Sequence, residues 1–207
     1  MDGVIADTNP FHAIAWKQFL EKYQIFPSET DFQDFMYGKS NEFILKHFIN
    51  PAFTEAAIEQ LAFDKESLFR DIYLPHVQPV AGLVAWLEIL NANHIITGVA
   101  TSAPIENMDF ILDKLNLRQH MQSLLSGNDV RKHKPDPEIY LKSAENLQVL
   151  PENCVVFEDS VSGVSAARNA GMKVVGVLTT YTPEQLPPCH AYISDYQGLT
   201  IDFLEKL

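Results

Sequence analysis

Two adjacent acids, Glu158 and Asp159, directly follow an apolar run, and they are the first residues in the sequence that suggest chemistry. Residues 154–157 have the composition of a buried strand. Two carboxylates at a strand end are costly unless a cation compensates their charge, and oxygen ligands of this kind suit Mg²⁺. Asp159 or Ser160 would equally serve as the N-cap of a helix beginning at Val161. Alone, the cluster leaves a metal site and a helix cap equally open.

A hydroxyl marks the end of a second apolar run. Thr101 closes residues 95–101 and is followed by Ser102, Ala103 and Pro104. Backbone N–H groups after a strand, with a proline opening the next helix, suit an anion such as phosphate. A simple helix cap by threonine or serine is the alternative, and this segment alone favours it.

A lysine between two prolines forms the third cluster. Pro135 and Pro137 restrict the backbone around Lys134, so its ammonium should be aimed in a fixed direction. An aimed lysine would neutralise nearby carboxylates and a phosphate together. Without further context, a solvated loop lysine is the simpler interpretation.

The N-terminal residues form the fourth cluster. Asp2 and Gly3 precede two apolar residues, and Asp7 and Thr8 follow. An Asp-Gly pair is often only a turn. Asp2 becomes meaningful when it is considered with the other three clusters.

The elements that must position these residues follow from the apolar pattern. Short β-branched runs alternate with helical patterns, which predicts a parallel, Rossmann-like α/β sheet. The expected strands are residues 94–101, 154–158, 173–178 and 191–194, and the expected helices are 83–91, 105–115, 137–147, 161–170 and a short one after 197. Chemistry in such sheets gathers at the carboxyl ends of the strands.

A different pattern, helical and rich in aromatic residues, covers residues 9–76. We therefore expect an α/β core domain formed by residues 1–8 and 77–207, with an inserted all-helical cap subdomain at 9–76. Trp16 and most aromatic residues of this segment are expected to pack in the core of the cap.

Composition limits the partners. Fifteen basic and twenty-seven acidic residues give a formal charge of -12, which argues against nucleic acid or an anionic membrane as partner. The two cysteines, Cys154 and Cys189, form no CxxC pair, so we expect reduced thiols. No leader and no bilayer-length apolar stretch is seen. We expect a cytoplasmic protein, a monomer or weak dimer. The negative charge does not exclude a phosphorylated small molecule as substrate, because a few local cations and a metal can reverse the field inside one cleft.

Together, the four clusters resemble the motifs of the haloacid dehalogenase superfamily, in the branch with a helical cap that contains beta-phosphoglucomutases and sugar-phosphate phosphatases. The first motif of that family is Asp-x-Asp-Gly-(Val/Thr), and residues 1–8 match it except for the leading Asp and the strand before it. Thr101 matches the second motif, Lys134 the third, and Glu158 with Asp159 the fourth.

The resemblance implies roles for these residues. Asp2 would be the general acid and base, and its backbone carbonyl would bind Mg²⁺. Asp159 would be a Mg²⁺ ligand, with Glu158 as a further ligand or a neighbour of one. Lys134 would hold the charges of the nucleophile and the phosphate. True dehalogenases lack the acid at Asp2, so its presence favours phosphate chemistry.

The resemblance also implies a phosphate site. Thr101, with the N–H groups of Ser102 and Ala103, would bind the phosphoryl oxygens, together with Lys134. In the cap, His12 resembles a residue that touches substrate, although packing within the helix is equally open. Lys39 lies in the loop that would select the substrate.

The nucleophilic Asp of the family would directly precede Met1. Either the natural protein starts further upstream, or this is a catalytically inactive member; we favour the first, because a missing central strand would leave its neighbours unpaired. As written, the chain is expected to show little or no turnover.

Three functions fit the resemblance. The first is a Mg²⁺-dependent phosphatase acting through an aspartyl-phosphate intermediate. The second is a phosphomutase of the beta-phosphoglucomutase type, which Asn41 disfavours because those mutases carry an arginine there to hold a second phosphate. The third is a non-catalytic phosphate-binding protein.

Overall fold

The computed structural model describes residues 1–37 and 39–207, and only the backbone of Gln33. The chain divides into two compact units. One unit joins Met1–Asp7 to Gln78–Leu207 and contains all the strands described. The other is Thr8–Val77, whose described elements are helices.

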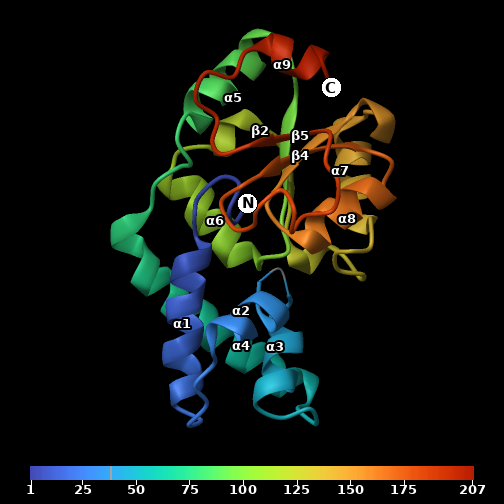
Figure 1. Ribbon diagram of the computed structural model, residues 1–207. Coiled ribbons are helices and arrows are strands. Elements are labelled where there is room, and N and C mark those ends of the chain that lie inside the picture. Colours follow the sequence, from blue (N-terminus) through green and yellow to red (C-terminus); the bar gives the residue numbers. More distant parts are fainter. Residues whose placement is uncertain (38) are drawn as a thin grey trace. The chain divides into compact units, whose positions relative to one another are not determined.

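The helical unit is built on hydroxyl-capped helices (Figure 1). Its elements are α1 (Asn9–Glu21), α2 (Glu29–Phe35), α3 (Asn41–Phe48), α4 (Glu55–Tyr73) and the 3₁₀ turn η1 (Leu74–His76). Ser28, Ser40 and Thr54 each accept a hydrogen bond from the N–H three residues further on, which satisfies a donor at the helix start. The buried core consists of Trp16, Phe19, Leu20, Phe32, Met36, Ile44, Leu45 and Ile58.

The α/β unit contains two parallel sheets flanked by helices (Figure 1). The strands are β1 (Thr97–Ala100), β2 (Met121–Leu125), β3 (Val155–Glu158), β4 (Lys173–Val177) and β5 (Ala191–Ile193). The helices are α5 (Leu83–Ala92), α6 (Ile105–Lys114), α7 (Glu138–Leu147), α8 (Val161–Asn169) and α9 (Ile201–Glu205), with 3₁₀ turns η2 (Arg118–His120), η3 (Gly127–Asp129) and η4 (Pro151–Asn153). One sheet has the order β1-β2 and the other β3-β4-β5. Within the part of the chain that the structure describes, no strand joins β1 to β3.

The predicted parallel α/β architecture is confirmed, but two strands differ from expectation. β1 is shorter than the predicted 94–101, because His94 has a φ of 58° and so lies in a turn. β2 was not expected, because its sequence Met-Gln-Ser-Leu-Leu contains no β-branched residue. Its pairing with β1 shows that tertiary contacts decided its conformation.

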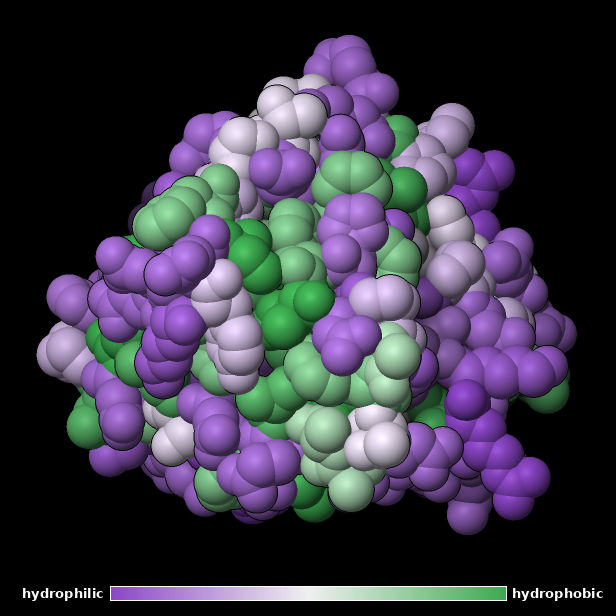
Figure 2. Space-filling view, turned by 90° about the horizontal axis from the view of Figure 1, so that it is seen from below, coloured by the Kyte–Doolittle hydropathy of each residue, from purple (hydrophilic) through white to green (hydrophobic). Residues whose placement is uncertain are grey.

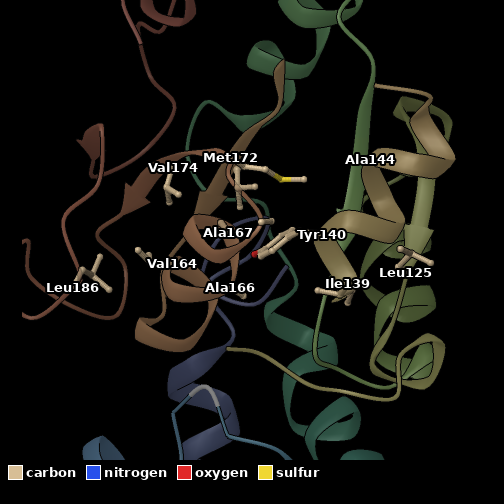
Figure 3. Close-up of a cluster of buried hydrophobic side chains, with 12 residues drawn as sticks. Leu125, Ile139, Tyr140, Ala144, Val164, Ala166, Ala167, Met172, Val174 and Leu186 are labelled. Carbon is tan, nitrogen blue, oxygen red and sulfur yellow. The ribbon is translucent and has the colours of Figure 1, made fainter. Parts of the chain in front are cut away.

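The core of the α/β unit lies between α7, α8 and the strands (Figure 3). It consists of Leu125, Ile139, Tyr140, Ala144, Val156, Val164, Ala166, Ala167, Ala170, Met172, Val174 and Leu186. Small alanines on α8 allow a close approach to β4, with which α8 is in contact. This packing fixes the ends of β3 and the start of α8, where the acidic pair lies.

Some large apolar side chains stay at the surface. In the helical unit, Phe26 is 75% exposed and Phe63 is 56% exposed. On the face shown in Figure 2, hydrophobic residues gather near the centre and hydrophilic residues surround them. Among the described residues, no helix has the length and apolarity needed to cross a bilayer.

Both cysteines are free thiols and partly buried. Burial raises the pKa of Cys154 and of Cys189 above the ordinary thiol value. A raised pKa leaves little reactive thiolate at neutral pH, so neither cysteine has the character of a nucleophile.

Candidate active site

Lys134 connects the carboxyl ends of the two sheets. Its ammonium donates to the backbone oxygen of Ala100, at the end of β1, over 3.1 Å. It also donates to Oε1 of Glu158, at the end of β3, over 2.6 Å. The Lys134 side chain is only 6% exposed, so its charge is held by these partners and not by solvent.

Tyr140, in the first turn of α7, completes a triangle with Lys134 and Glu158. Its hydroxyl accepts from the Lys134 ammonium over 2.9 Å and donates to Oε1 of Glu158 over 2.8 Å. The ammonium also lies 4.6 Å from the centre of the Tyr140 ring, within cation–π range. Burial, and then the charge of Glu158, raise the pKa of Tyr140 well above its ordinary value, so the hydroxyl keeps its proton.

Both carboxylate oxygens of Glu158 are engaged. Oε1 accepts from Lys134 and Tyr140. Oε2 accepts from the backbone N–H groups of the next two residues and from the hydroxyl of Ser160. Burial alone would raise the pKa of Glu158, but the Lys134 charge and the hydrogen bonds lower it to about 2. Glu158 is therefore an ionised anchor for Lys134.

The start of α8 bears on the choice between a helix cap and a metal site. Ser160 supplies the cap, because its hydroxyl accepts from the N–H of Gly163 over 3.0 Å. Gly163 in turn leaves room for the acid, since a Cβ there would overlap the Glu158 carboxyl group. Asp159 is thus not needed as a cap.

Asp159 is a second buried carboxylate, 5% exposed. Its Oδ2 accepts a hydrogen bond from the hydroxyl of Thr180, in the loop after β4, over 2.5 Å. Burial, followed by the charges of Glu158 and Asp2, raises the pKa of Asp159 to about 7. The cost of ionising this carboxylate is what a bound cation would relieve.

The N-terminal turn brings Asp2 close to Asp159. The N–H of Gly3 donates to the backbone oxygen of Ala6 over 2.8 Å, and Gly3 has a φ of +65°. A Cβ on Gly3 would overlap the carboxyl group of Asp159, so only glycine allows this approach. The hydroxyl of Thr179 donates to the Gly3 carbonyl over 2.6 Å and fixes the turn from the loop after β4.

Thr101 follows β1 and is 2% exposed. Its N–H donates to the carbonyl of Leu125 in β2, and its Oγ1 accepts from the N–H of Ala103 over 3.1 Å. Ser102 is exposed. Thr101 thus lies directly after the carbonyl that Lys134 contacts, whereas the Ala103 N–H points back to Thr101. The phosphate cradle of Thr101, Ser102 and Ala103 stays a prediction.

His12 belongs to a polar cluster within the helical unit. Its Nδ1 lies 2.9 Å from the ammonium of Lys65, and its ring stacks on Phe69 with centres 3.7 Å apart. Lys65 is 1% exposed and donates to Oε1 of Glu66 over 2.9 Å. A substrate role for His12 stays a prediction, since this cluster gives the ring partners of its own.

Lys39 and Asn41 flank the start of α3. Lys39 is exposed, with its ammonium 5.7 Å from the centre of the Phe43 ring. The Asn41 side chain donates to Oε1 of Glu66 over 2.9 Å. Gly38, the first residue of the expected substrate loop, lies outside the described residues.

The residues at the strand ends suit a hard divalent cation but do not enclose one. Asp159 and Asp2 place negative charge together in a buried setting, which favours Mg²⁺ binding. Among residues 1–37 and 39–207, no group of three or more His, Cys, Asp or Glu side chains is placed to hold a metal ion. Glu158 uses both its oxygens on protein donors, which suits a supporting role better than a ligand role.

Sequence reasoning missed three residues of this site. Tyr140 has the spacing of a helix-core aromatic residue, and its ring does pack in the core. Thr179 and Thr180 come shortly after the apolar strand β4, near its carboxyl end, as Thr101 does after β1. The polar residues after β4 were therefore the sequence signal that could have identified Thr179 and Thr180.

A lysine and buried acids meet at the strand ends of a parallel α/β unit, an arrangement typical of a class of hydrolases. Comparison of the sequence with protein families identifies that class. The family described as haloacid dehalogenase-like hydrolase matches residues 1–177. The chain belongs to this family.

Relatives in the family are named for phosphate chemistry. A phosphorylated carbohydrates phosphatase of Thermotoga maritima is 31% identical, over 86% of this chain and 82% of the relative. A beta-phosphoglucomutase of Bacillus subtilis is also 31% identical, over 86% of this chain and 80% of the relative. The crystal structure of a HAD hydrolase of family IA, variant 3, from Entamoeba histolytica matches with a TM-score of 0.89 and 27% identity, over 98% of this chain and 93% of that one.

Proposed function

We propose that this protein is a Mg²⁺-dependent phosphatase of small phosphorylated sugars. The observation that carries the proposal is the placement of the Lys134 ammonium between the end of β1 and Glu158, the neighbour of the buried Asp159. Phosphoryl transfer mainly requires positioning and charge neutralisation, and a fixed ammonium beside buried carboxylates suits both. The phosphatase and mutase names of the relatives support phosphate as the group transferred.

The roles follow from the positions of the residues. The Asp159 carboxylate and the Asp2 backbone carbonyl would hold Mg²⁺, which supplies positive charge to the phosphoryl oxygens when bound. The Asp2 carboxyl group would protonate the leaving oxygen and then remove a proton from water. Lys134 would direct toward the phosphate the N–H that now bonds the Ala100 carbonyl, immediately before Thr101.

We place the nucleophile on the residue that precedes Met1 in the natural protein. A carboxylate there would attack phosphorus, form an aspartyl-phosphate and release the sugar, and water would then regenerate the carboxylate. The separation of β1 from β3 among the described strands supports an additional strand between them. The N-terminal turn lies against the end of β3, because Gly3 closely approaches the Asp159 carboxyl group, and this suits such a connection. Without that segment, we expect little or no turnover.

The alternative is a phosphomutase. A mutase must hold a bisphosphate by both ends, which requires cations in the cap. Asn41 instead bonds Glu66, and Glu66 pairs with the buried Lys65, so this cluster offers little net positive charge. Lys39, which is exposed and lies two residues before Asn41, keeps the mutase as the runner-up. A third possibility is a protein that binds phosphate without turning it over.

The test compares two forms of the protein on p-nitrophenyl phosphate, with and without EDTA. One form is the chain of 207 residues, and the other carries the residues encoded in frame upstream of Met1. We expect Mg²⁺-dependent release of phosphate from the longer form, abolished in its Lys134→Ala variant. Turnover that persists in EDTA would refute the Mg²⁺ role. Sugar-phosphate isomerisation without net phosphate release would identify the mutase, and phosphate binding by an inert longer form would identify the third possibility.

A further inference from the structure

We infer that Tyr140 is a positioning residue of this site, whose hydroxyl sets the direction of the Lys134 ammonium. The inference rests on the proposed function, because it concerns how Lys134 meets a phosphate. Tyr140 accepts one N–H of Lys134 and donates its own proton to Glu158, so it connects the cation to its carboxylate partner.

Two fixed hydrogen bonds of the Lys134 ammonium determine the direction of its third N–H. An ammonium has three donors. One bonds Glu158 and one bonds Tyr140, and the third is donated to the Ala100 carbonyl at the end of β1. Because the first two partners are fixed, the third N–H must point toward the residues that follow β1. Thr101 comes next, so an anion held there would meet this N–H.

The ring of Tyr140 and its hydroxyl have different partners and different roles. The ring packs in the core between α7 and α8, where Figure 3 shows it among Ala166, Ala167 and Ile139. The hydroxyl faces Lys134 and Glu158. Phenylalanine would fill the same volume as the ring while removing one acceptor for Lys134 and one donor for Glu158. Tyr140→Phe therefore isolates the positioning role from packing.

Ser143→Ala is the matched control. Ser143 lies on the same helix, is also buried, and its hydroxyl donates to the Ser123 hydroxyl over 3.3 Å, which involves no residue of the site. The readout is the Kd of inorganic phosphate in the presence of Mg²⁺, measured by calorimetry on the 207-residue chain. We expect Tyr140→Phe to weaken phosphate binding by about fivefold, the factor that corresponds to the typical net contribution of one hydrogen bond, and Ser143→Ala to leave it unchanged.

A double-mutant cycle separates this inference from the proposed function. Tyr140→Phe, Lys134→Met and the double variant are compared by their midpoints of urea unfolding. Unchanged phosphate affinity in Tyr140→Phe, or an equal loss in Ser143→Ala, would overturn the inference. The proposed function is decided separately, by the turnover of the longer form. If the 207-residue chain binds no phosphate, the cycle decides the inference: additive effects overturn the link between Tyr140 and Lys134, and non-additive effects support it.

Discussion

The hydroxyl of Thr180 lies 2.5 Å from Oδ2 of Asp159, so the loop after β4 donates directly to a buried carboxylate at the end of β3. This hydrogen bond favours the ionised form of Asp159, whereas burial and the charges of Glu158 and Asp2 oppose it. The opposition dominates, because the pKa of Asp159 rises to about 7 from 3.8. Asp159 should therefore make the folded state less stable as the pH rises, whereas an acid with a lowered pKa would make it more stable.

We expect Asp159 to lower the melting temperature as the pH rises toward 7 in the absence of Mg²⁺. Because the folded-state pKa of Asp159 lies above the ordinary 3.8, the unfolded chain releases this proton first, and the folded state loses relative stability between the two values. Above a pH of about 7 the loss is complete and constant. Glu158 acts only in more acidic solution, because its pKa is lowered to about 2 from 4.5, so its contribution is lost as the pH falls through that range.

Thermal unfolding between about pH 5 and pH 8 measures this dependence, since Glu158 is ionised in both states there. Asp159→Asn is the control, because it removes the titrating group while keeping the size of the side chain. The melting temperature of the wild type relative to this variant should fall as the pH rises, and this difference separates Asp159 from the buried Met1 amino group, whose lowered pKa acts in the opposite direction. Equal slopes in the two proteins would mean that Asp159 ionises at an ordinary pH. Added Mg²⁺ should raise the wild-type melting temperature most at neutral pH.

Thr180→Val should move this pH dependence to higher pH. The variant keeps the branched shape but removes the donor to Asp159, so the pKa of Asp159 should rise further. The pH at which the contribution of Asp159 to the melting temperature stops falling would shift upward accordingly. Thr182→Val offers a comparison in the same loop, since the Thr182 side chain bonds Glu184 and not Asp159. Identical profiles for Thr180→Val and wild type would show that the hydroxyl does not act on Asp159.

Lys134→Met should destabilise the α/β unit strongly, because it leaves Glu158 ionised and buried without its cation. Removing one partner of a buried ion pair typically costs about 3–5 kcal/mol. Glu158→Gln should also destabilise, since it leaves the Lys134 charge without a carboxylate. The double variant removes both charges and should lose less than the sum of the single losses. Urea unfolding measures the three free energies, and strict additivity would exclude a direct coupling of the pair.

Much of this fold could be predicted from the pattern of apolar residues. The runs that became β3 and β4 are rich in valine, and each meets a helix with a clear apolar face. β2 escaped prediction, because Met121–Leu125 becomes a strand through its pairing with β1 and not through its own preference.

The site was predictable to the extent that its residues stand at strand ends. Glu158 and Asp159 fall there, whereas Lys134 lies in the loop before α7, where its two flanking prolines drew attention to it. The contacts of Tyr140 and Thr180 were not predictable, because they depend on which helix and loop the sheet order brings against β3. Sequence spacing identifies strand ends, but it does not identify the neighbours that tertiary packing supplies.

Gly3→Ala should disturb the site more than its backbone strain alone explains. Gly198→Ala is the matched control, because Gly198 also has a positive φ, +72°, but has nothing within 4 Å of the position a Cβ would take. An alanine at a left-handed position costs about 1–2 kcal/mol, so Gly198→Ala should lower stability by that amount and leave Mg²⁺ binding unchanged. Gly3→Ala carries the same strain and in addition displaces the Asp159 carboxyl group, so it should also weaken the stabilisation by Mg²⁺. The shift of melting temperature with Mg²⁺ measures this difference. Equal Mg²⁺ responses in the two variants would show that the close approach of Gly3 to Asp159 does not shape the cation site.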